Sequence, residues 1–232
     1  MLHFCGKSYT FALTIYKTTT NMIPRLAFIL TILLTACSAS GSQPTKETTV
    51  STTTDTIAKT AVQLPPMPDK PTGTAWIVVS KREMTLSVYD RNAVGDTVMV
   101  AQYPCCMGKN KGDKVKRGDM RTPESPSGKP FKITMIQDAS TWKHDFKDGR
   151  GNIKAYGHWF LRLETPGHRG IGIHGSTNNE NTVPGRASEG CIRLLDKDII
   201  TLKEHFAYVG MPVTVQAEDQ APMEWEERAR NR

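Results

Sequence analysis

The sequence predicts a mainly β domain, a sandwich or barrel with one helix, between residues 75 and 216. Short segments rich in Val, Ile, Thr and aromatic residues recur there between turn residues, a pattern typical of strands. A later segment instead repeats its apolar residues every three to four positions, a pattern typical of a helix. The chain of 232 residues contains no internal repeat, so we expect one domain with further segments on either side.

Residues 1–36 are expected to be an export signal. Arg25 is followed by an apolar run, 26–34, that is too short to span a bilayer. The run closes on LTAC, which resembles the lipobox of bacterial lipoproteins and would make Cys37 the lipidated first residue of the mature protein. Met22 is the better candidate start, because the residues before it add nothing that a secretion signal needs. The alternative, a short buried core helix, fits poorly with the polar, threonine-rich stretch that follows.

The lipoprotein resemblance implies a place in the bacterial cell envelope. Several acyl chains on Cys37 would tether the protein to a membrane, with the folded part facing the periplasm and the cell wall, because one chain alone anchors weakly. Without the expected signal the chain keeps 27 basic and 23 acidic residues, a formal charge of about +4. This mild excess fits contact with an anionic polymer or membrane surface and is far from the footprint of a nucleic-acid-binding protein.

Two segments beside the predicted domain carry no recognisable chemistry. Residues 37–74 are rich in Thr, Pro and Lys and poor in aromatic residues, so they cannot bury enough apolar surface to fold. We expect them to be a flexible linker. Residues 217–232 are mostly charged and are expected to be a fringe or a short surface helix.

Each expected element of the domain follows from its local pattern. AWIVVS and MTLSVYD are separated by KRE, which predicts a hairpin. A later segment spaces Ile199, Leu202 and Phe206 as a helix would. Asp196 is the expected N-cap of that helix and Gly210 its expected stop. The expected strands are 75–80, 84–90, 97–108, 131–137, 158–164, 170–175 and 211–216.

A long loop, residues 108–130, is crowded with Gly, Pro and Lys. Ordered loops of this length are often lids or binding loops, and otherwise mobile connectors. Its basic residues could attract an acidic polymer, but on charge alone a solvated surface is the better interpretation.

Two cysteines, Cys105 and Cys106, are adjacent in a strand-like segment. Their side chains should point to opposite faces, one into the core and one to the surface. A bond between neighbours would be strained. Thiol-disulfide exchange is a weak alternative, because the two-residue spacing of the usual redox pair is missing.

The segment from 170 to 199, GIGIHGSTNNENTVPGRASEGCIRLLDKDI, holds the candidate chemistry. A strand would deliver His174 at its end, and a turn would expose Cys191, with Gly190 allowing unusual dihedrals. A histidine within hydrogen-bond reach can take the proton of a thiol, and the N–H groups of Gly190 and Cys191 are free in such a turn to face a developing oxyanion. Arg193 could clamp a substrate carboxylate. Taken without further context, a buried structural cysteine and a surface histidine would be the commoner case.

Several segments together resemble the L,D-transpeptidase catalytic domain family, the cysteine enzymes that cross-link the bacterial cell wall. SEGCIRL, whose cysteine lies seventeen positions after the histidine of a histidine-glycine pair, is similar to the family signature. RTPESPSGKPFKI resembles a second segment of the family, and the opening hairpin resembles its start. The resemblance covers most of residues 75 to 216, so it implies this family's β fold.

The resemblance implies a role for each matching residue. Cys191 would be the nucleophile and His174 the general base. Arg193 would receive the carboxylate of the substrate. Gly175 follows the histidine where some members have serine, so the group that orients the imidazole ring is expected to be a backbone carbonyl.

The turn before the cysteine matches the family with one departure. Ser188 and Gly190 belong to the motif, whereas Glu189 stands where the family usually has a second histidine. A carboxylate near the thiol would oppose thiolate formation but could stabilise an imidazolium. We interpret the chain as an active variant.

The implied reaction is a two-step acyl transfer on peptidoglycan stem peptides. The thiolate would attack a tetrapeptide stem and expel the terminal D-alanine, and an amine of a neighbouring stem would accept the acyl group in a 3→3 cross-link. Water as acceptor would give an L,D-carboxypeptidase, and a catalytically silent wall-binding lipoprotein is the alternative from another class. The reaction needs no cofactor and no metal. His144, His158 and His168 lack metal-ligand spacing, so solvated or structural roles are expected for them.

Overall fold

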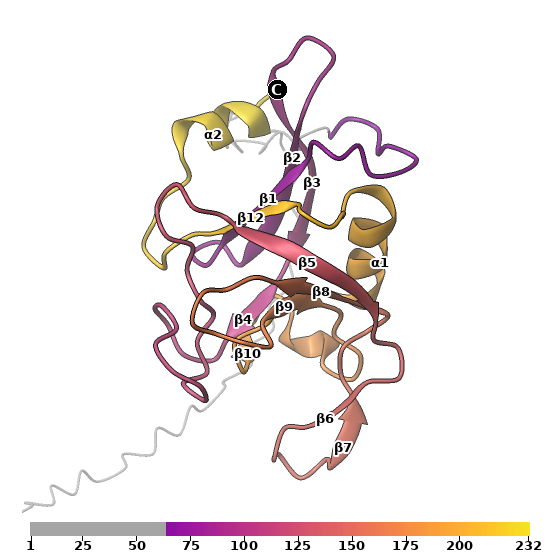
Figure 1. Cartoon of the computed structure of the whole chain (residues 1–232), viewed down its shortest axis with the longest axis vertical. Helices are drawn as coiled ribbons and strands as arrows, with labels where there is room; N and C mark the ends of the chain where they lie inside the picture. Colours follow the sequence, from indigo (N-terminus) through magenta and orange to yellow (C-terminus); the bar gives the residue numbers. More distant parts are fainter. Residues whose placement is uncertain (1–63) are drawn as a thin grey trace, which may run out of the picture. The chain divides into compact units, whose positions relative to one another are not determined.

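The computed structural model describes residues 64–232 (Figure 1). The expected export signal, Cys37 and most of the expected linker lie outside the described residues. Within residues 64–232, no helix combines the length and the apolar character needed to cross a membrane.

One mixed sheet of ten strands dominates the described part, and the predicted mainly β class is confirmed. The strands are β1 (Trp76–Ser80), β2 (Thr85–Arg91), β3 (Thr97–Pro104), β4 (Cys106–Gly108), β5 (Phe131–Asp138), β8 (Trp159–Leu163), β9 (Gly172–His174), β10 (Gly185–Ser188), β11 (Ile192–Arg193) and β12 (Pro212–Val215). Their order in the sheet is β10-β4-β11-β9-β8-β5-β12-β1-β2-β3. A separate hairpin joins β6 (Lys143–Asp145) to β7 (Asn152–Lys154). Every predicted strand segment contains a strand, whereas β6, β7, β10 and β11 were not predicted.

Strand β1 shows why the sheet is covered on both faces. Its apolar run is continuous, and successive side chains of a strand point to opposite faces. Ile77 and Val79 enter the main core, whereas Val78 enters a second cluster together with Tyr89. The main core also takes buried side chains from β5, β8, β9 and β11, so it joins the two halves of the sheet.

Helix α1 (Asp196–His205) covers β8 and β9 with Ile199 and Leu202 buried, as the apolar spacing predicts. The prediction of Asp196 as its N-cap is wrong. Leu195 occupies the cap position, and the Asp196 carboxylate accepts hydrogen bonds from residues 176 and 177 instead. The helix also ends before Gly210, because Phe206 leaves the helical conformation and turns its ring into the core.

The end of the chain forms a second helix, α2 (Glu224–Arg230), that lies on the sheet rather than beside it. Ala229 is buried against the second cluster, and the Trp225 ring meets the edge of Tyr89 at 5.1 Å between centroids. Glu226 is fully buried and accepts a hydrogen bond from Gln216 at 2.7 Å. Of the two expectations for residues 217–232, a fringe or a short surface helix, the helix is present, and it completes the packing on one face of the sheet.

The long loop between β4 and β5 is held to the end of β1 by a buried lysine, Lys81. Lys81 is 1% exposed, and its ammonium donates to the carbonyls of Gly112 and Thr122 and to the Glu124 carboxylate at 2.6–2.9 Å. Burial lowers the pKa of Lys81, and the hydrogen bond with Glu124 opposes this shift. A fully buried ammonium needs such a set of acceptors. Lys81 thereby ties both sides of the loop to the end of β1.

Cys105 and Cys106 are both fully buried, so the prediction that one of them lies on the surface is wrong. Their side chains do face different surroundings, but β4 is an internal strand with β10 and β11 on its two sides. Burial raises the pKa of the Cys105 thiol. Neither thiol is therefore placed for reaction with solutes.

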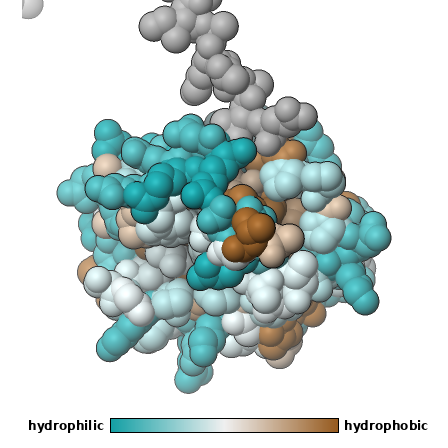
Figure 2. All heavy atoms as spheres, turned by 90° about the horizontal axis from the view of Figure 1, so that it is seen from above, coloured by the Kyte–Doolittle hydropathy of each residue, from teal (hydrophilic) through white to brown (hydrophobic). Residues whose placement is uncertain are grey.

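On the face drawn in Figure 2, hydrophilic side chains predominate and apolar ones form small separate patches. Leu64 and Met67 are exposed in one segment, and the other exposed large apolar residues are spread along the described chain, namely Val94, Val115, Met135, Val209 and Met223.

Candidate active site

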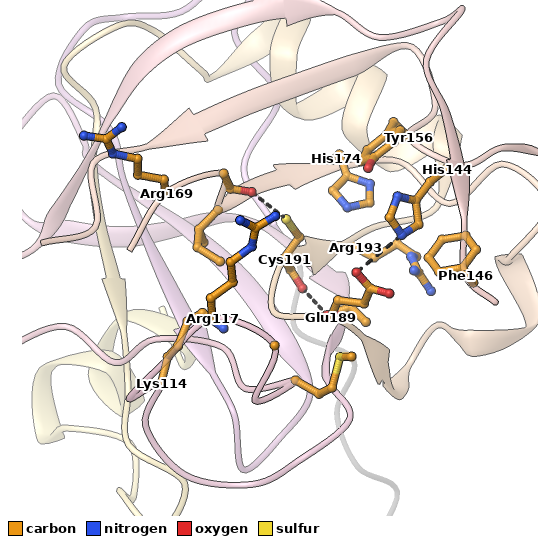
Figure 3. Close-up of a pocket in the computed structure, with 15 residues that line it drawn as sticks. Lys114, Arg117, His144, Phe146, Tyr156, Arg169, His174, Glu189, Cys191 and Arg193 are labelled. Atoms are coloured by element: carbon orange, nitrogen blue, oxygen red, sulfur yellow. Dashed lines mark hydrogen bonds and ion pairs between the residues drawn. The ribbon is translucent and has the colours of Figure 1, made fainter. Parts of the chain in front are cut away.

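A pocket of about 250 Å³ lies beside Cys191 (Figure 3). Four parts of the chain form its wall: the long loop after β4, the β6–β7 hairpin with the segment that follows it, the end of the β8–β9 connection with β9, and the turn between β10 and β11. The lining residues are Lys114, Arg117, Gly118, Met120, His144, Phe146, Tyr156, Arg169, Gly170, Ile171, His174, Ser188, Glu189, Cys191 and Arg193.

The pairing of β9 with β11 brings the predicted catalytic residues together. The strands are parallel, with Ile192 beside Ile173 and Arg193 beside His174. Because side chains alternate along strands, the two isoleucines enter the core while His174, Arg193 and the residue before β11, Cys191, share the other face. His174 and Cys191, seventeen positions apart in sequence, are thus brought together by the pairing of two neighbouring strands.

His174 is buried, and its ring orientation is fixed on three sides. Phe160 stacks on it at 5.7 Å between ring centroids, and Tyr156 lies at 4.9 Å. Nδ1 lies 2.7 Å from the carbonyl oxygen of Gly175. A carbonyl can only accept, so Nδ1 carries the proton and Nε2 keeps its lone pair. Burial and the nearby Arg193 charge lower the pKa of His174 to about 3, which leaves the ring neutral near pH 7.

Cys191 is only partly exposed, and its thiol is protonated at neutral pH. Burial raises the pKa of the thiol, and the Glu189 carboxylate raises it further. The backbone N–H of Gly172 and the Arg193 charge act in the opposite direction. Sγ donates to the Gly170 carbonyl at 3.4 Å rather than to His174. The thiol proton must therefore change its acceptor before the sulfur can act as a nucleophile.

Ser188 organises the turn that carries Cys191. Its hydroxyl donates to the Cys191 carbonyl at 2.6 Å and accepts from the Gly190 N–H at 3.1 Å. The expectation that the Gly190 N–H is free for an oxyanion is therefore wrong, and the Cys191 N–H is the remaining candidate of the two. Gly190 has φ +137°, and a Cβ there would lie 2.8 Å from the Arg121 carbonyl oxygen, so this turn requires glycine.

Arg193 lines the pocket but is 2% exposed. Its guanidinium donates to the Thr182 hydroxyl at 2.9 Å and lies 5.6 Å from the centre of the Phe146 ring. Most of the surface of Arg193 is therefore covered by other residues of the protein, so a bound carboxylate would contact only the edge of the guanidinium. Arg117 and Arg169 are exposed at the same pocket, and the described residues supply no carboxylate partner for either.

Glu189 receives a partner that the sequence did not indicate. Its Oε2 lies 3.3 Å from Nε2 of His144, which comes from β6. His144 packs against the edge of Phe146 at 4.6 Å between ring centroids. A structural role was expected for His144, and the structure adds its place: it lines the pocket and contacts the one motif position that departs from the family.

Residues 74–215 match the model of the family described as the L,D-transpeptidase catalytic domain, YkuD. The chain belongs to this family. No match was found among the curated proteins.

Solved structures similar to this L,D-transpeptidase domain have low sequence identity. An L,D-transpeptidase from Mycobacterium smegmatis is 19% identical, with a TM-score of 0.44, over 62% of this chain and 58% of that one. Bd1075 from Bdellovibrio bacteriovorus is 20% identical, with a TM-score of 0.46, over 72% and 58%. The helical cell shape determining protein Pgp2 from Campylobacter jejuni is 18% identical, with a TM-score of 0.45, over 73% and 55%. The matched part is less than two thirds of the length of each of these proteins.

The β6–β7 hairpin of this L,D-transpeptidase domain and its contact with Glu189 were not predicted from sequence, for different reasons. The Asp148–Gly149 pair between two short segments is a hairpin signal that could have located β6 and β7. Nothing in that segment indicates that the hairpin reaches Glu189, because this contact is set by tertiary packing. Arg150 supplies part of that packing, with hydrogen bonds to the Asn178 carbonyl and the Asn179 side chain.

The neutral His174 predicts a pH-dependent part of the stability of this L,D-transpeptidase domain. The pKa of this histidine falls from an ordinary 6.5 to about 3 on folding. Between these pH values the unfolded chain binds a proton that the folded protein excludes. The stabilisation is complete above pH 6.5 and is lost as the pH falls toward 3, by roughly 3 kcal/mol at pH 4.

Urea unfolding at pH 7 and pH 4 measures this contribution. His174→Gln should lose less unfolding free energy between the two pH values than the wild type does. His158→Gln is the matched control, because His158 is exposed and should keep the wild-type dependence. An equal loss in wild type and His174→Gln would contradict the assignment of a buried neutral imidazole.

Proposed function

We propose that the protein is a peptidoglycan L,D-transpeptidase that uses Cys191 as its nucleophile and forms 3→3 cross-links. One observation carries the proposal. A neutral imidazole, that of His174, and a thiol, that of Cys191, share one face of two paired strands and open into the same pocket. The Gly175 carbonyl fixes the histidine tautomer whose Nε2 accepts a proton. This is the arrangement that cysteine acyl transfer requires.

The first half of the reaction is acylation of the enzyme. The Cys191 thiol gives its proton to Nε2 of His174, and Sγ attacks the carbonyl at the L-centre of the diamino acid in a tetrapeptide stem. The Cys191 N–H would donate to the resulting oxyanion. The bond to the D-alanine nitrogen then breaks, His174 returns the proton to that nitrogen, and D-alanine leaves.

The second half transfers the acyl group. The amine of a neighbouring stem attacks the thioester carbonyl and gives its proton to His174. The carbon–sulfur bond breaks, the sulfur leaves as a thiolate and recovers the proton, and an amide joins the third residues of the two stems. Water in place of the amine would give a tripeptide and make the protein an L,D-carboxypeptidase.

The charge of the pocket supports a stem peptide as substrate. Arg117 and Arg169 are exposed in its wall, and Lys114 lies there in an ion pair with Asp119. Stem peptides carry several carboxylates, and guanidinium groups bind carboxylates with two hydrogen bonds. The binding of substrate carboxylates is accordingly assigned to Arg193 together with these two exposed arginines.

The test is incubation of the full chain with purified tetrapeptide muropeptides, with Cys191→Ala as control, and mass spectrometry of the products. Dimers joined through the third residue are the expected result. Tripeptide alone would replace the transpeptidase by the carboxypeptidase. No Cys191-dependent product from several stem types would leave a silent wall-binding protein.

We also propose that lipid on Cys37 anchors the protein to an envelope membrane with the domain facing the periplasm. The support is the LTAC sequence after a short apolar run. Cys37→Ser should move the protein from the membrane fraction to the soluble fraction of lysed cells. Unchanged sedimentation with membranes would count against the anchor.

A further inference from the structure

The pocket beside Cys191 has an uneven distribution of charge. Glu189 supplies the one carboxylate among its described lining residues, which otherwise include a lysine and three arginines. Figure 3 shows Arg117 and Arg169 on one side of Cys191, and Glu189 with His144 and Arg193 on the other. A ligand that lies across Cys191 therefore meets two exposed arginines at one end and, at the other, an exposed carboxylate beside the buried Arg193.

The Glu189 carboxylate is held in place and remains accessible. Oε2 lies 3.3 Å from His144 Nε2, and the Glu189 side chain is 46% exposed. Oε1 has no hydrogen-bonding partner in the described part of the chain. Only Gly190 separates Glu189 from Cys191, so their Cα atoms lie within about 7 Å of each other. A group bound by Oε1 would stay close to the reacting carbonyl.

A carboxylate at this position works against the chemistry at Cys191. Glu189 raises the pKa of the thiol, which opposes formation of the thiolate. That effect would be offset if a cation neutralised the carboxylate when substrate binds. Among residues 64–232, only His144 is a direct partner of Glu189, and it contacts a single carboxylate oxygen.

We propose that Glu189, positioned by His144, binds the primary ammonium group at the end of a diamino acid side chain and selects substrates that carry it. This inference rests on the proposed function and adds a specificity residue to it. The ammonium would lie against Oε1, while the arginines on the other side of Cys191 bind substrate carboxylates. Two sources have this chemistry, namely the third residue of the acyl donor and the attacking amine of the acceptor stem.

Binding to an inactive protein tests the subsite without turnover. The full chain with Cys191→Ala is titrated calorimetrically with two synthetic tetrapeptide stems, one with a free side-chain amine at its third residue and one with that amine acetylated. We expect the free amine to bind about 10- to 100-fold more tightly, the usual worth of a charged hydrogen bond. Adding Glu189→Gln should bring the two dissociation constants to within about twofold, whereas Glu189→Lys should favour the acetylated peptide.

The matched control is Glu224→Gln in the same Cys191→Ala background, because Glu224 is exposed on α2, remote from the pocket-lining residues. It should keep the full preference for the free amine. The proposal is overturned if Glu189→Gln keeps that preference, if neither peptide binds, or if the two peptides bind equally well to the Cys191→Ala protein.

A second arm separates the two sources of the ammonium and also separates this proposal from the proposed function. Active protein and its Glu189→Gln variant are both given free-amine stems. Slower thioester formation on Cys191 in Glu189→Gln identifies the donor amine, whereas unchanged thioester formation with slower dimer formation identifies the acceptor amine. Absence of Cys191-dependent product from the active protein refutes the proposed function, while the calorimetric ratio still decides whether Glu189 binds an ammonium group.

Discussion

One equivalent of a carbapenem-type β-lactam is expected to add to Cys191, and none to the Cys191→Ala protein. The thiol would give its proton to His174, and Sγ would attack the strained lactam carbonyl. The ring C–N bond breaks and the nitrogen takes the proton, so the protein should gain the whole mass of the β-lactam. The expected effect is complete loss of labelling in the variant, because no other described thiol is accessible.

Cys105 and Cys106 are internal controls for this reaction. Both are fully buried, so peptide mapping should find them unmodified in folded protein. His174→Gln should slow the labelling of Cys191 by about 100-fold or more, since a base in reach of a nucleophile contributes about that much. Equal labelling of the wild type and Cys191→Ala, or labelling unaffected by His174→Gln, would remove the basis of the assigned nucleophile and base.

Asp196→Ala is expected to damage the site from outside the pocket. Oδ1 of Asp196 accepts the Ser176 N–H at 2.6 Å, and Oδ2 accepts the Thr177 hydroxyl. These bonds tie the chain that follows His174 and Gly175 to the start of α1. A buried N–H that loses a charged acceptor costs about 1–3 kcal/mol. Displacement of the Gly175 carbonyl would also free the His174 ring, and misplacement by about 1 Å can lower a rate 100-fold.

Asp198→Ala is the matched control, because Asp198 lies in the same first turn of α1 and makes no side-chain hydrogen bond to a described residue. Urea unfolding and Cys191 labelling measure the two expected losses. Asp196→Ala should lower both the free energy of unfolding and the rate of Cys191 labelling. Asp198→Ala should be labelled at a rate near that of the wild type. Similar behaviour of the two variants would contradict the role of Asp196 in positioning the chain that follows His174.

The strands and α1 could be predicted from sequence because their patterns are local. Alternation and short apolar runs locate β1, β2 and β5, and the spacing of Ile199, Leu202 and Phe206 locates α1. The site residues on β9 and β11 were also predictable, since a resemblance to a family motif carries tertiary information that composition and periodicity lack. Strands β10 and β11 were missed because both are short and β10 contains no large apolar residue.

The errors arise where a distant part of the chain decides a residue's surroundings. Asp196 has the chemistry of an N-cap, but hydrogen bonds from the chain after His174 compete successfully for its carboxylate. Cys106 is buried because β10 and β11, more than 75 positions further along, lie on both sides of β4. His144 meets Glu189 across 45 positions of sequence, and no local pattern records such a contact.

The position of β12 has a consequence for the way this protein is made. In the sheet, β12 is the strand that joins β1 on one side to β5 on the other, yet it is the last strand in the chain. A growing polypeptide therefore lacks the strand that unites the two parts of its sheet until residues 212–215 have been made. The domain should accordingly become resistant to proteases only after β12 has been added between β1 and β5.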